Sequence, residues 1–158
     1  MPENGTCNLC GGRSFKLFKK AKSLYSEDFH DVIQCARCGL VCVSDVDPER
    51  VIDVYRNDPN SVTYFLGRQR RDNILFNSIL KELSSYIEFR SGMRLLDIGC
   101  GIGTFLNMAR SEGWDVTGLE PNVSAAQYAV KTYGLNVIQG TLNETSFPAE
   151  SFDVVTMI

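Results

Sequence analysis

The sequence predicts an α/β chain in which a doubly wound parallel sheet of about four strands follows a small cysteine-rich module and a helical linker. Two observations carry this prediction. From residue 93 to residue 158, short apolar runs alternate with helix-like segments and short loops, the pattern of a parallel sheet with right-handed crossovers. Before residue 45, four of the six cysteines stand in two close pairs. The predicted regions are therefore 1–45, 46–92 and 93–158.

The composition is that of a globular chain. Hydrophobic residues make up 44% of the 158 residues and charged residues 22%, which is enough apolar material for a core. No apolar run approaches the roughly 18 residues that span a bilayer, and the start shows no leader pattern, so we expect a cytoplasmic protein without a membrane partner. A net charge of −3 makes nucleic acid an unexpected partner.

The cysteine-rich module contains two C-x-x-C-G pairs, at residues 7–11 and 35–39. Each pair can turn two thiolates toward one point, and the glycine after the second cysteine can adopt the positive φ of such a knuckle. Four thiolates are the tetrahedral set for structural zinc, which predicts a zinc-ribbon-like module. A rubredoxin-like iron site and a pair of disulfides are the alternatives. The predicted metal ligands are Cys7, Cys10, Cys35 and Cys38.

The linker is predicted to be helical. Asp47-Pro48-Glu49 is typical of a helix start, and this short helix is expected to run to about Tyr55. After a break at residues 57–61, a longer helix follows, with an apolar stripe that we expect to pack against the next region. The stripe comprises Phe76, Ile79, Leu80, Leu83 and Ile87.

The third region begins with a strand, a glycine turn and a helix start within residues 93–106. Gly113 is expected to end this helix, and residues 114–120 form a second strand that ends in an acid. A helix at about residues 122–133, capped by Gly134, and a strand at 135–139 repeat the pattern. In such sheets ligands bind beyond the carboxyl ends of the strands, where both the glycine turn and the acid are expected.

The glycine spacing argues against a dinucleotide site. That fingerprint has the spacing G-x-G-x-x-G, whereas counting from Gly99 places Thr104 where the third glycine is needed. Asp97 precedes the turn, where a pyrophosphate would gain nothing from a negative charge. The acid suits a ligand with a cationic end.

The motif D-x-G-x-G-x-G from Asp97 to Gly103, followed by Glu120 at the end of the next strand, resembles the class I S-adenosylmethionine-dependent methyltransferases. The resemblance covers residues 93–158 well and residues 60–92 loosely. It implies a Rossmann-like fold, S-adenosylmethionine or S-adenosylhomocysteine as cofactor, and methyl transfer from the sulfonium to an oxygen, nitrogen or carbon acceptor. A small-molecule methyl acceptor is expected.

The resemblance also implies roles for the residues of the turn. Asp97 would reach the methionyl ammonium directly or through water. Gly99, Cys100 and Gly101 would let the backbone approach the methionyl and ribose parts closely. Cys100 is expected to be a packing residue, because methyl transfer from a sulfonium needs no covalent enzyme intermediate.

Further cofactor contacts follow from the same resemblance. Glu120 would accept hydrogen bonds from both ribose hydroxyls, and Pro121 would lie beside the adenine. Thr104 and Phe105 would line the start of the helix after the turn. The adenine edge is expected to meet the residues after the third strand, Gly140, Thr141 and Leu142.

One of these contacts departs from the family pattern, and the partner of the cofactor's carboxylate is a choice among neighbouring residues. Thr141 has only a hydroxyl where relatives commonly place an acid for the adenine amino group. For the cofactor's carboxylate, relatives often use a tyrosine or arginine from the helix before the first strand. Tyr64 and Arg71 are the candidates here, and Arg70 is a near equal.

The end of the sequence, FDVVTMI at residues 152–158, predicts a buried strand, and the resemblance identifies it as the fourth core strand. We therefore expect the front part of a larger enzyme, truncated after this strand and catalytically incomplete. The catalytic residues are unknown, and no histidine follows His30. An apolar edge here predicts self-association through residues 152–158.

Two other functions remain open at this point. The chain could be a non-catalytic, zinc-containing module that binds S-adenosylmethionine or a partner. A nicotinamide oxidoreductase is the third candidate.

Overall fold

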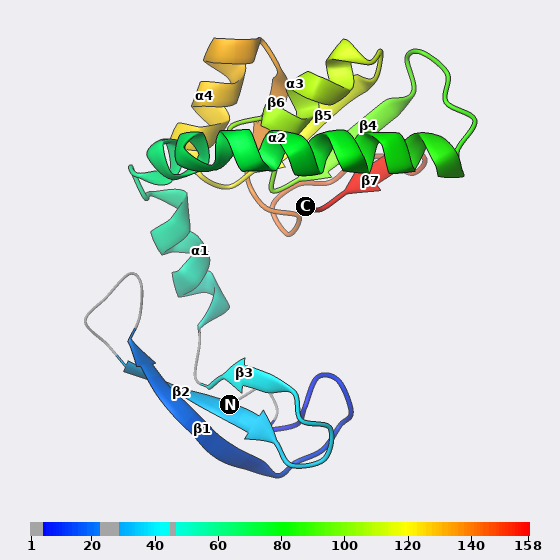
Figure 1. Cartoon of the computed structure of the whole chain (residues 1–158). Coiled ribbons are helices and arrows are strands. Elements are labelled where there is room, and N and C mark those ends of the chain that lie inside the picture. The colour runs from blue at the N-terminus through cyan, green and yellow to red at the C-terminus, as the bar shows by residue number, and fades with distance from the viewer. Residues whose placement is uncertain (1–4, 23–28, 45–46) are drawn as a thin grey trace. The chain divides into compact units, whose positions relative to one another are not determined.

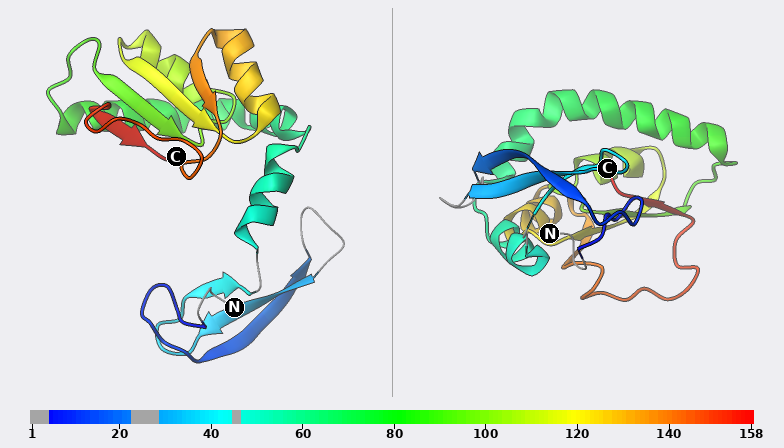
Figure 2. Two further views of the ribbon diagram at one scale, coloured as in Figure 1. Left: turned by 180° about the vertical axis from the view of Figure 1, so that it is seen from behind. Right: turned by 90° about the horizontal axis from the view of Figure 1, so that it is seen from below.

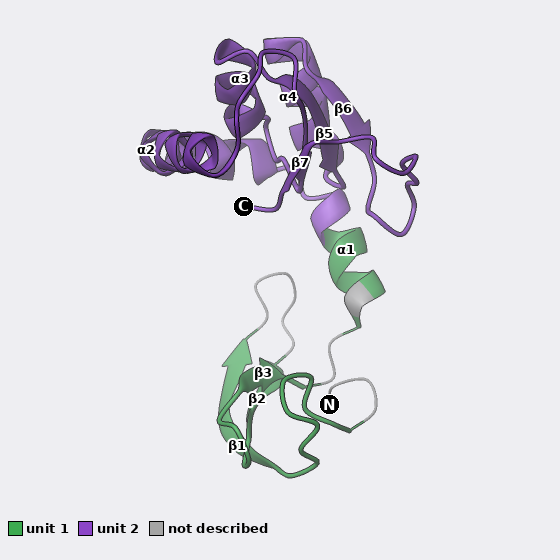
Figure 3. Ribbon diagram, turned by 90° about the vertical axis from the view of Figure 1, so that its right-hand side faces the viewer, with its two compact units in different colours: residues 1–54 green, residues 55–158 purple. Residues whose placement is uncertain are grey.

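The computed structural model describes residues 5–22, 29–44 and 47–158. The chain forms two compact units, residues 1–54 and 55–158, which Figure 3 shows in two colours. The boundary between the units lies inside the predicted linker, and the predicted limits at residues 45 and 92 stay predictions. Among the described helices, none combines the length and the apolarity that crossing a membrane would require.

The first unit holds a three-stranded antiparallel sheet in the order β1-β2-β3. Its strands are β1 (Phe15–Lys22), β2 (Phe29–Cys35) and β3 (Val41–Val43). Val32 and Ile33 of β2 are buried, whereas most of β1 is exposed. This small sheet therefore has little apolar core of its own.

Helix α1 (Pro48–Arg56) begins in the first unit and ends in the second. Asp47 caps it as predicted, because its Oδ1 accepts hydrogen bonds from the backbone N–H groups of Glu49 at 3.0 Å and Arg50 at 3.4 Å. These bonds satisfy amides that have no partner within the helix.

The second unit is a four-stranded parallel sheet in the order β6-β5-β4-β7 (Figure 1). Its elements are α2 (Ser61–Tyr86), β4 (Arg94–Ile98), α3 (Thr104–Ser111), β5 (Asp115–Glu120), α4 (Val123–Tyr133), β6 (Asn136–Gln139) and β7 (Val154–Thr156). The strand order reverses on passing from β6 to β7, so β4 and β7 flank the topological switch point. The predicted α/β fold class and its four parallel strands are confirmed.

Helix α2 packs on the helices of this sheet, and the three helices lie together in the views of Figure 2. The predicted apolar stripe of α2 is confirmed: Leu80 is 1% exposed, and Phe76, Ile79, Leu83 and Ile87 pack against the same core. The core also contains Leu95 of β4 and Leu106 of α3, both fully buried. This packing holds the start of α2 beside the carboxyl ends of the strands.

Strand β7 is shorter and more exposed than the sequence predicts. It pairs with β4 alone among the described strands, so Val155 is 56% exposed and Met157 71% exposed. The prediction of a buried strand is therefore wrong for the described chain, although the pairing with β4 agrees with the expected fourth strand. Self-association through residues 152–158 stays a prediction.

Candidate functional site

The glycine turn between β4 and α3 is fixed by backbone bonds and by close packing. The N–H of Gly99 donates to the carbonyl of Leu119 at 2.7 Å, which ties the turn to the end of β5. Gly103 has a φ of 77°, and a Cβ there would lie 2.6 Å from Leu135 Cδ1. Gly101 has a φ of 54°, and its Cβ would meet the Phe65 ring at 3.0 Å. Both positions therefore require glycine.

Asp97 lies near the end of β4 and is 4% exposed. Its Oδ1 accepts a hydrogen bond from Thr156 Oγ1 of β7 at 2.8 Å. Burial raises the pKa of Asp97 to about 7, although the Thr156 bond opposes this shift. A cation beside Asp97 would favour its ionised form.

Glu120 lies at the end of β5 and is completely buried. Its Oε2 accepts the N–H of Gly101 and its Oε1 the N–H of Asn122, each at 2.7 Å. Burial raises the pKa of this carboxyl, and the two backbone bonds oppose the shift. The carboxylate thus joins the glycine turn to the start of α4. Pro121, between Glu120 and Asn122, is half-buried.

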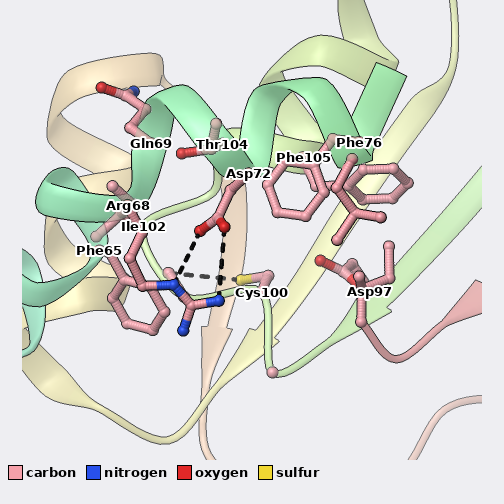
Figure 4. Close-up of a pocket in the computed structure, with 14 residues that line it drawn as sticks. Phe65, Arg68, Gln69, Asp72, Phe76, Asp97, Cys100, Ile102, Thr104 and Phe105 are labelled. Atoms are coloured by element: carbon pink, nitrogen blue, oxygen red, sulfur yellow. Dashed lines mark hydrogen bonds and ion pairs between the residues drawn. The ribbon is translucent and has the colours of Figure 1, made fainter. Parts of the chain in front are cut away.

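A pocket opens between the glycine turn and helix α2 (Figure 4). Six of the predicted cofactor residues line it: Asp97, Gly99, Cys100, Gly101, Thr104 and Phe105. The opposite wall comes from α2 and includes Phe65, Arg68, Asp72 and Phe76. The structure therefore brings the turn and residues 65–76 of α2 to one cavity.

Arg68 and Asp72 line the pocket but are not among the predicted cofactor residues. The guanidinium of Arg68 lies 3.5 Å from both carboxylate oxygens of Asp72. With Asp97 across the pocket, the lining carries one cationic and two acidic side chains. These charges complement a ligand that has one carboxylate and two cationic groups. The i, i+4 spacing of Arg68 and Asp72 was a signal that they share a helix face.

The predicted carboxylate partners lie outside this pocket. Tyr64 is 57% exposed and bonds through its hydroxyl to Arg68, whose Cζ also lies 5.1 Å from the Tyr64 ring centre. The Arg71 side chain is 72% exposed and lies 3.5 Å from Asp72. Arg70 is exposed as well. The roles of Tyr64 and Arg71 therefore remain predictions.

The segment after β6 is tied to the end of α1. Glu144 Oε2 accepts hydrogen bonds from the N–H and the hydroxyl of Thr141 at 2.9 and 3.0 Å. Arg56 donates to both oxygens of Glu144 at 2.6 and 2.8 Å, and this pairing lowers the pKa of Glu144. Gly140 is buried and bonds to the carbonyl of Glu120, whereas Leu142 is 47% exposed.

The four predicted metal ligands converge in the first unit. Their Sγ atoms all lie within 4.8 Å of one another, and the cross-pairs Cys7–Cys38 and Cys10–Cys35 are 3.6 and 3.7 Å apart. A disulfide would need about 2.05 Å, so the described cysteines form none. A tetrahedral ion with a metal–sulfur distance of about 2.3 Å separates its sulfurs by about 3.8 Å.

The two cysteine knuckles share one backbone pattern. The N–H of Gly11 donates to the carbonyl of Cys7, and that of Gly39 donates to the carbonyl of Cys35, at 2.8 and 3.0 Å. Both glycines have the predicted positive φ, 69° and 79°. Arg37 of one knuckle donates to the Cys10 carbonyl of the other at 3.0 Å. The cluster fits a four-thiolate metal site, and zinc and iron both suit this geometry.

Comparisons with known proteins agree on the second unit. A family described as "Methyltransferase domain" matches residues 66–158. A sterol 24-C-methyltransferase of Gibberella zeae is 36% identical over 84 residues, which are 48% of this chain and 22% of the relative. Nocamycin O-methyltransferase of Saccharothrix syringae is 36% identical over 90 residues, 51% of this chain and 32% of the relative.

A solved structure supports the fold. The magnesium protoporphyrin IX methyltransferase of Synechocystis, solved with bound S-adenosylmethionine, superposes with a TM-score of 0.53 at 13% identity, over 72% of this chain and 62% of its own. At this identity the likeness concerns the fold alone. The chain spans between a fifth and a third of the length of the two curated relatives above.

Proposed function

The chain belongs to the methyltransferase-domain family, and from this premise we propose that it binds S-adenosylmethionine in the pocket between the glycine turn and α2. The observation that carries the proposal is the joint placement of Asp97, the turn and the Arg68–Asp72 pair around one cavity. When bound, this cofactor supplies a methyl group on a cationic sulfur.

The pocket residues fit the methionyl end of such a ligand. Asp97 offers a carboxylate to the ammonium group, and Arg68 offers a guanidinium to the carboxylate, a charge-assisted pairing. No Cβ atom is present at Gly99, and an added one would meet nothing within 4 Å, so the turn leaves space for a ligand. Glu120 is the acceptor for a ribose diol, and the segment 140–142 is the proposed adenine edge.

We further propose that the whole protein uses this site for methyl transfer to a small molecule. The curated relatives carry names that specify a sterol and nocamycin as the compounds concerned. The contribution of this chain is to bind and orient the methyl donor. Holding the methyl carbon in line with the acceptor atom accounts for much of the rate acceleration of such displacements.

For the cysteine cluster we propose a structural zinc ion. The four thiolates leave no open coordination position, which favours a structural ion. The sheet of this unit buries few apolar side chains, and metal binding would supply folding free energy that such a small unit lacks.

Isothermal titration calorimetry of the purified chain with S-adenosylhomocysteine tests the cofactor proposal. We expect one ligand per chain, and no comparable binding of NADH. Glu120→Gln should abolish measurable binding, whereas Glu112→Gln, an exposed acid at the end of α3, should not change it. Tight binding of NADH with none of S-adenosylhomocysteine would overturn the proposal.

A further inference from the structure

The nucleoside half of the proposed site is closed in this structure. Glu120, the acceptor for the ribose diol, is 0% exposed and is absent from the residues that line the open pocket. A ligand can reach this carboxylate only if a covering segment moves. The inference that follows rests on the proposed function.

The covering segment includes residues 55–58, which are the last two residues of α1 and the first two of its connection to α2 and are called the junction below. Asn122 is fully buried, and its Nδ2 donates to the carbonyls of Tyr55 at 2.6 Å and Asp58 at 3.0 Å. The Tyr55 side chain lies near Glu120, where its hydrogen-bonding interaction lowers the pKa of that carboxyl and so opposes the effect of burial. The junction is therefore fastened to the residue that the ribose needs.

A second tie holds the same junction from the side of the adenine edge. Arg56 pairs with both oxygens of Glu144, and Glu144 in turn holds the N–H and hydroxyl of Thr141. The N–H and hydroxyl of Thr141 are thus occupied by Glu144. Both ties link residues of the α1 end to the proposed nucleoside site.

The hydrogen-bonding capacity of Glu120 shows that one partner must leave. A carboxylate offers about four acceptor positions. The N–H groups of Gly101 and Asn122 take two, and Tyr55 takes a third. A ribose diol needs two positions and finds one free. The two backbone donors are fixed in the turn and at the start of α4, so the displaceable partner is Tyr55.

We propose that residues 55–58 form a gate over the nucleoside half of the cofactor site, held shut by Asn122 and the Arg56–Glu144 pair and released when a ligand diol replaces Tyr55 on Glu120. Asn122 is then a positioning residue that sets the fraction of open molecules. The apparent dissociation constant equals the intrinsic one divided by that fraction. Weakening the ties should therefore strengthen binding.

The test is the association rate of S-adenosylhomocysteine with the purified chain, measured by surface plasmon resonance. In Asn122→Ser the serine keeps the cap of α4 but is too short to donate to both carbonyls. We expect association at least about fivefold faster, the effect of one lost net hydrogen bond. Tyr55→Phe, which leaves α4 untouched, should act in the same direction.

Asn122→Ala separates the gate from the cap. It loses both functions, so it should associate as fast as Asn122→Ser but melt at a lower temperature. Association that is unchanged or slower in both Asn122→Ser and Tyr55→Phe, with binding by the wild type intact, overturns the gate alone. Binding by the variants without binding by the wild type supports it. Absence of binding in every protein overturns the proposed function and the gate with it.

Discussion

Thr156 Oγ1 donates a 2.8 Å hydrogen bond to Oδ1 of Asp97 and so joins β7 to the acid that precedes the glycine turn. The two residues are also paired across the parallel ladder. This bond lowers a pKa that burial and the charge of Glu120 raise, and the net value for Asp97 is about 7. The protonation state of the proposed ammonium partner is therefore sensitive near neutral pH.

Cofactor affinity should fall as the pH drops below about 7. The ligand ammonium favours ionised Asp97, so the complex binds fewer protons than the free chain, and affinity rises with pH up to the free pKa and is level above it. The limiting slope is about tenfold per pH unit. Titration calorimetry with S-adenosylhomocysteine between pH 5.5 and 8 measures this dependence of affinity on pH.

The matched variants identify the titrating group. Thr156→Val removes the bond that lowers the pKa, so the midpoint should move to higher pH. Thr132→Val, at an exposed position on α4, should leave it in place. Asp97→Asn should bind more weakly and without this pH dependence. A pH profile that Asp97→Asn leaves intact would assign the titration to another group.

Arg68 should contribute more to cofactor affinity than Arg71. Arg68 lines the pocket, whereas the Arg71 side chain is 72% exposed. Arg68→Gln should weaken S-adenosylhomocysteine by roughly 10- to 100-fold, the range for a charge-assisted hydrogen bond, and leave adenosine binding unchanged. The affinity of Arg71→Gln for S-adenosylhomocysteine should stay near that of the wild type. The reverse order would support the sequence-based choice of Arg71.

The choice between these arginines shows where sequence reasoning stops. Tyr64, Arg68 and Arg71 recur at three to four residues, so a helix places all three along one stripe. Which of them meets the pocket depends on how α2 packs against the turn, and this is set by core contacts of Leu80 and Phe76. Local periodicity predicts which residues share a stripe on the helix, but not how far the helix is rotated about its axis relative to the pocket.

Long-range polar contacts were beyond prediction for a different reason. Asn122 bonds to the carbonyl of Tyr55 across 67 positions of sequence, and backbone carbonyls carry no residue-specific signal. The glycine turn, the knuckles and the Gly134 cap at the end of α4 were predictable because each depends on neighbouring residues. Strand β1 was not predicted, because it is mostly exposed and its lysines are equally typical of a solvated surface segment.

The first unit should bind one zinc ion per chain. Its Sγ atoms already have nearly the separations that a tetrahedral ion requires. Native mass spectrometry should show one zinc, lost in Cys35→Ser and retained in Cys42→Ser, since Cys42 lies on β3 outside the cluster. Hydrogen exchange should show lost protection in β2 after chelation. Iron in place of zinc would appear as thiolate-to-metal absorption in the visible range.

Gly118→Ala should destabilise the second unit because its added Cβ would clash with two buried side chains. A Cβ at Gly118 would lie 2.5 Å from Cys100 Sγ and 2.8 Å from Leu106 Cδ1, and overpacking of this kind costs about 1–3 kcal/mol. Gly67→Ala is the matched control, since its Cβ on α2 would meet nothing within 4 Å and alanine favours the helix. Urea unfolding measures the free energy of unfolding of both variants.

Adding Cys100→Ala to Gly118→Ala should recover part of this loss, because it removes the nearer of the two clashing atoms while Leu106 remains. The double-mutant cycle should then show a favourable coupling energy, whereas additive energies would contradict the packing role. Burial raises the pKa of the Cys100 thiol, so it stays protonated at neutral pH and is a poor nucleophile. Cys100→Ala alone should accordingly retain S-adenosylhomocysteine binding, whereas lost binding would show that the thiol contacts the ligand.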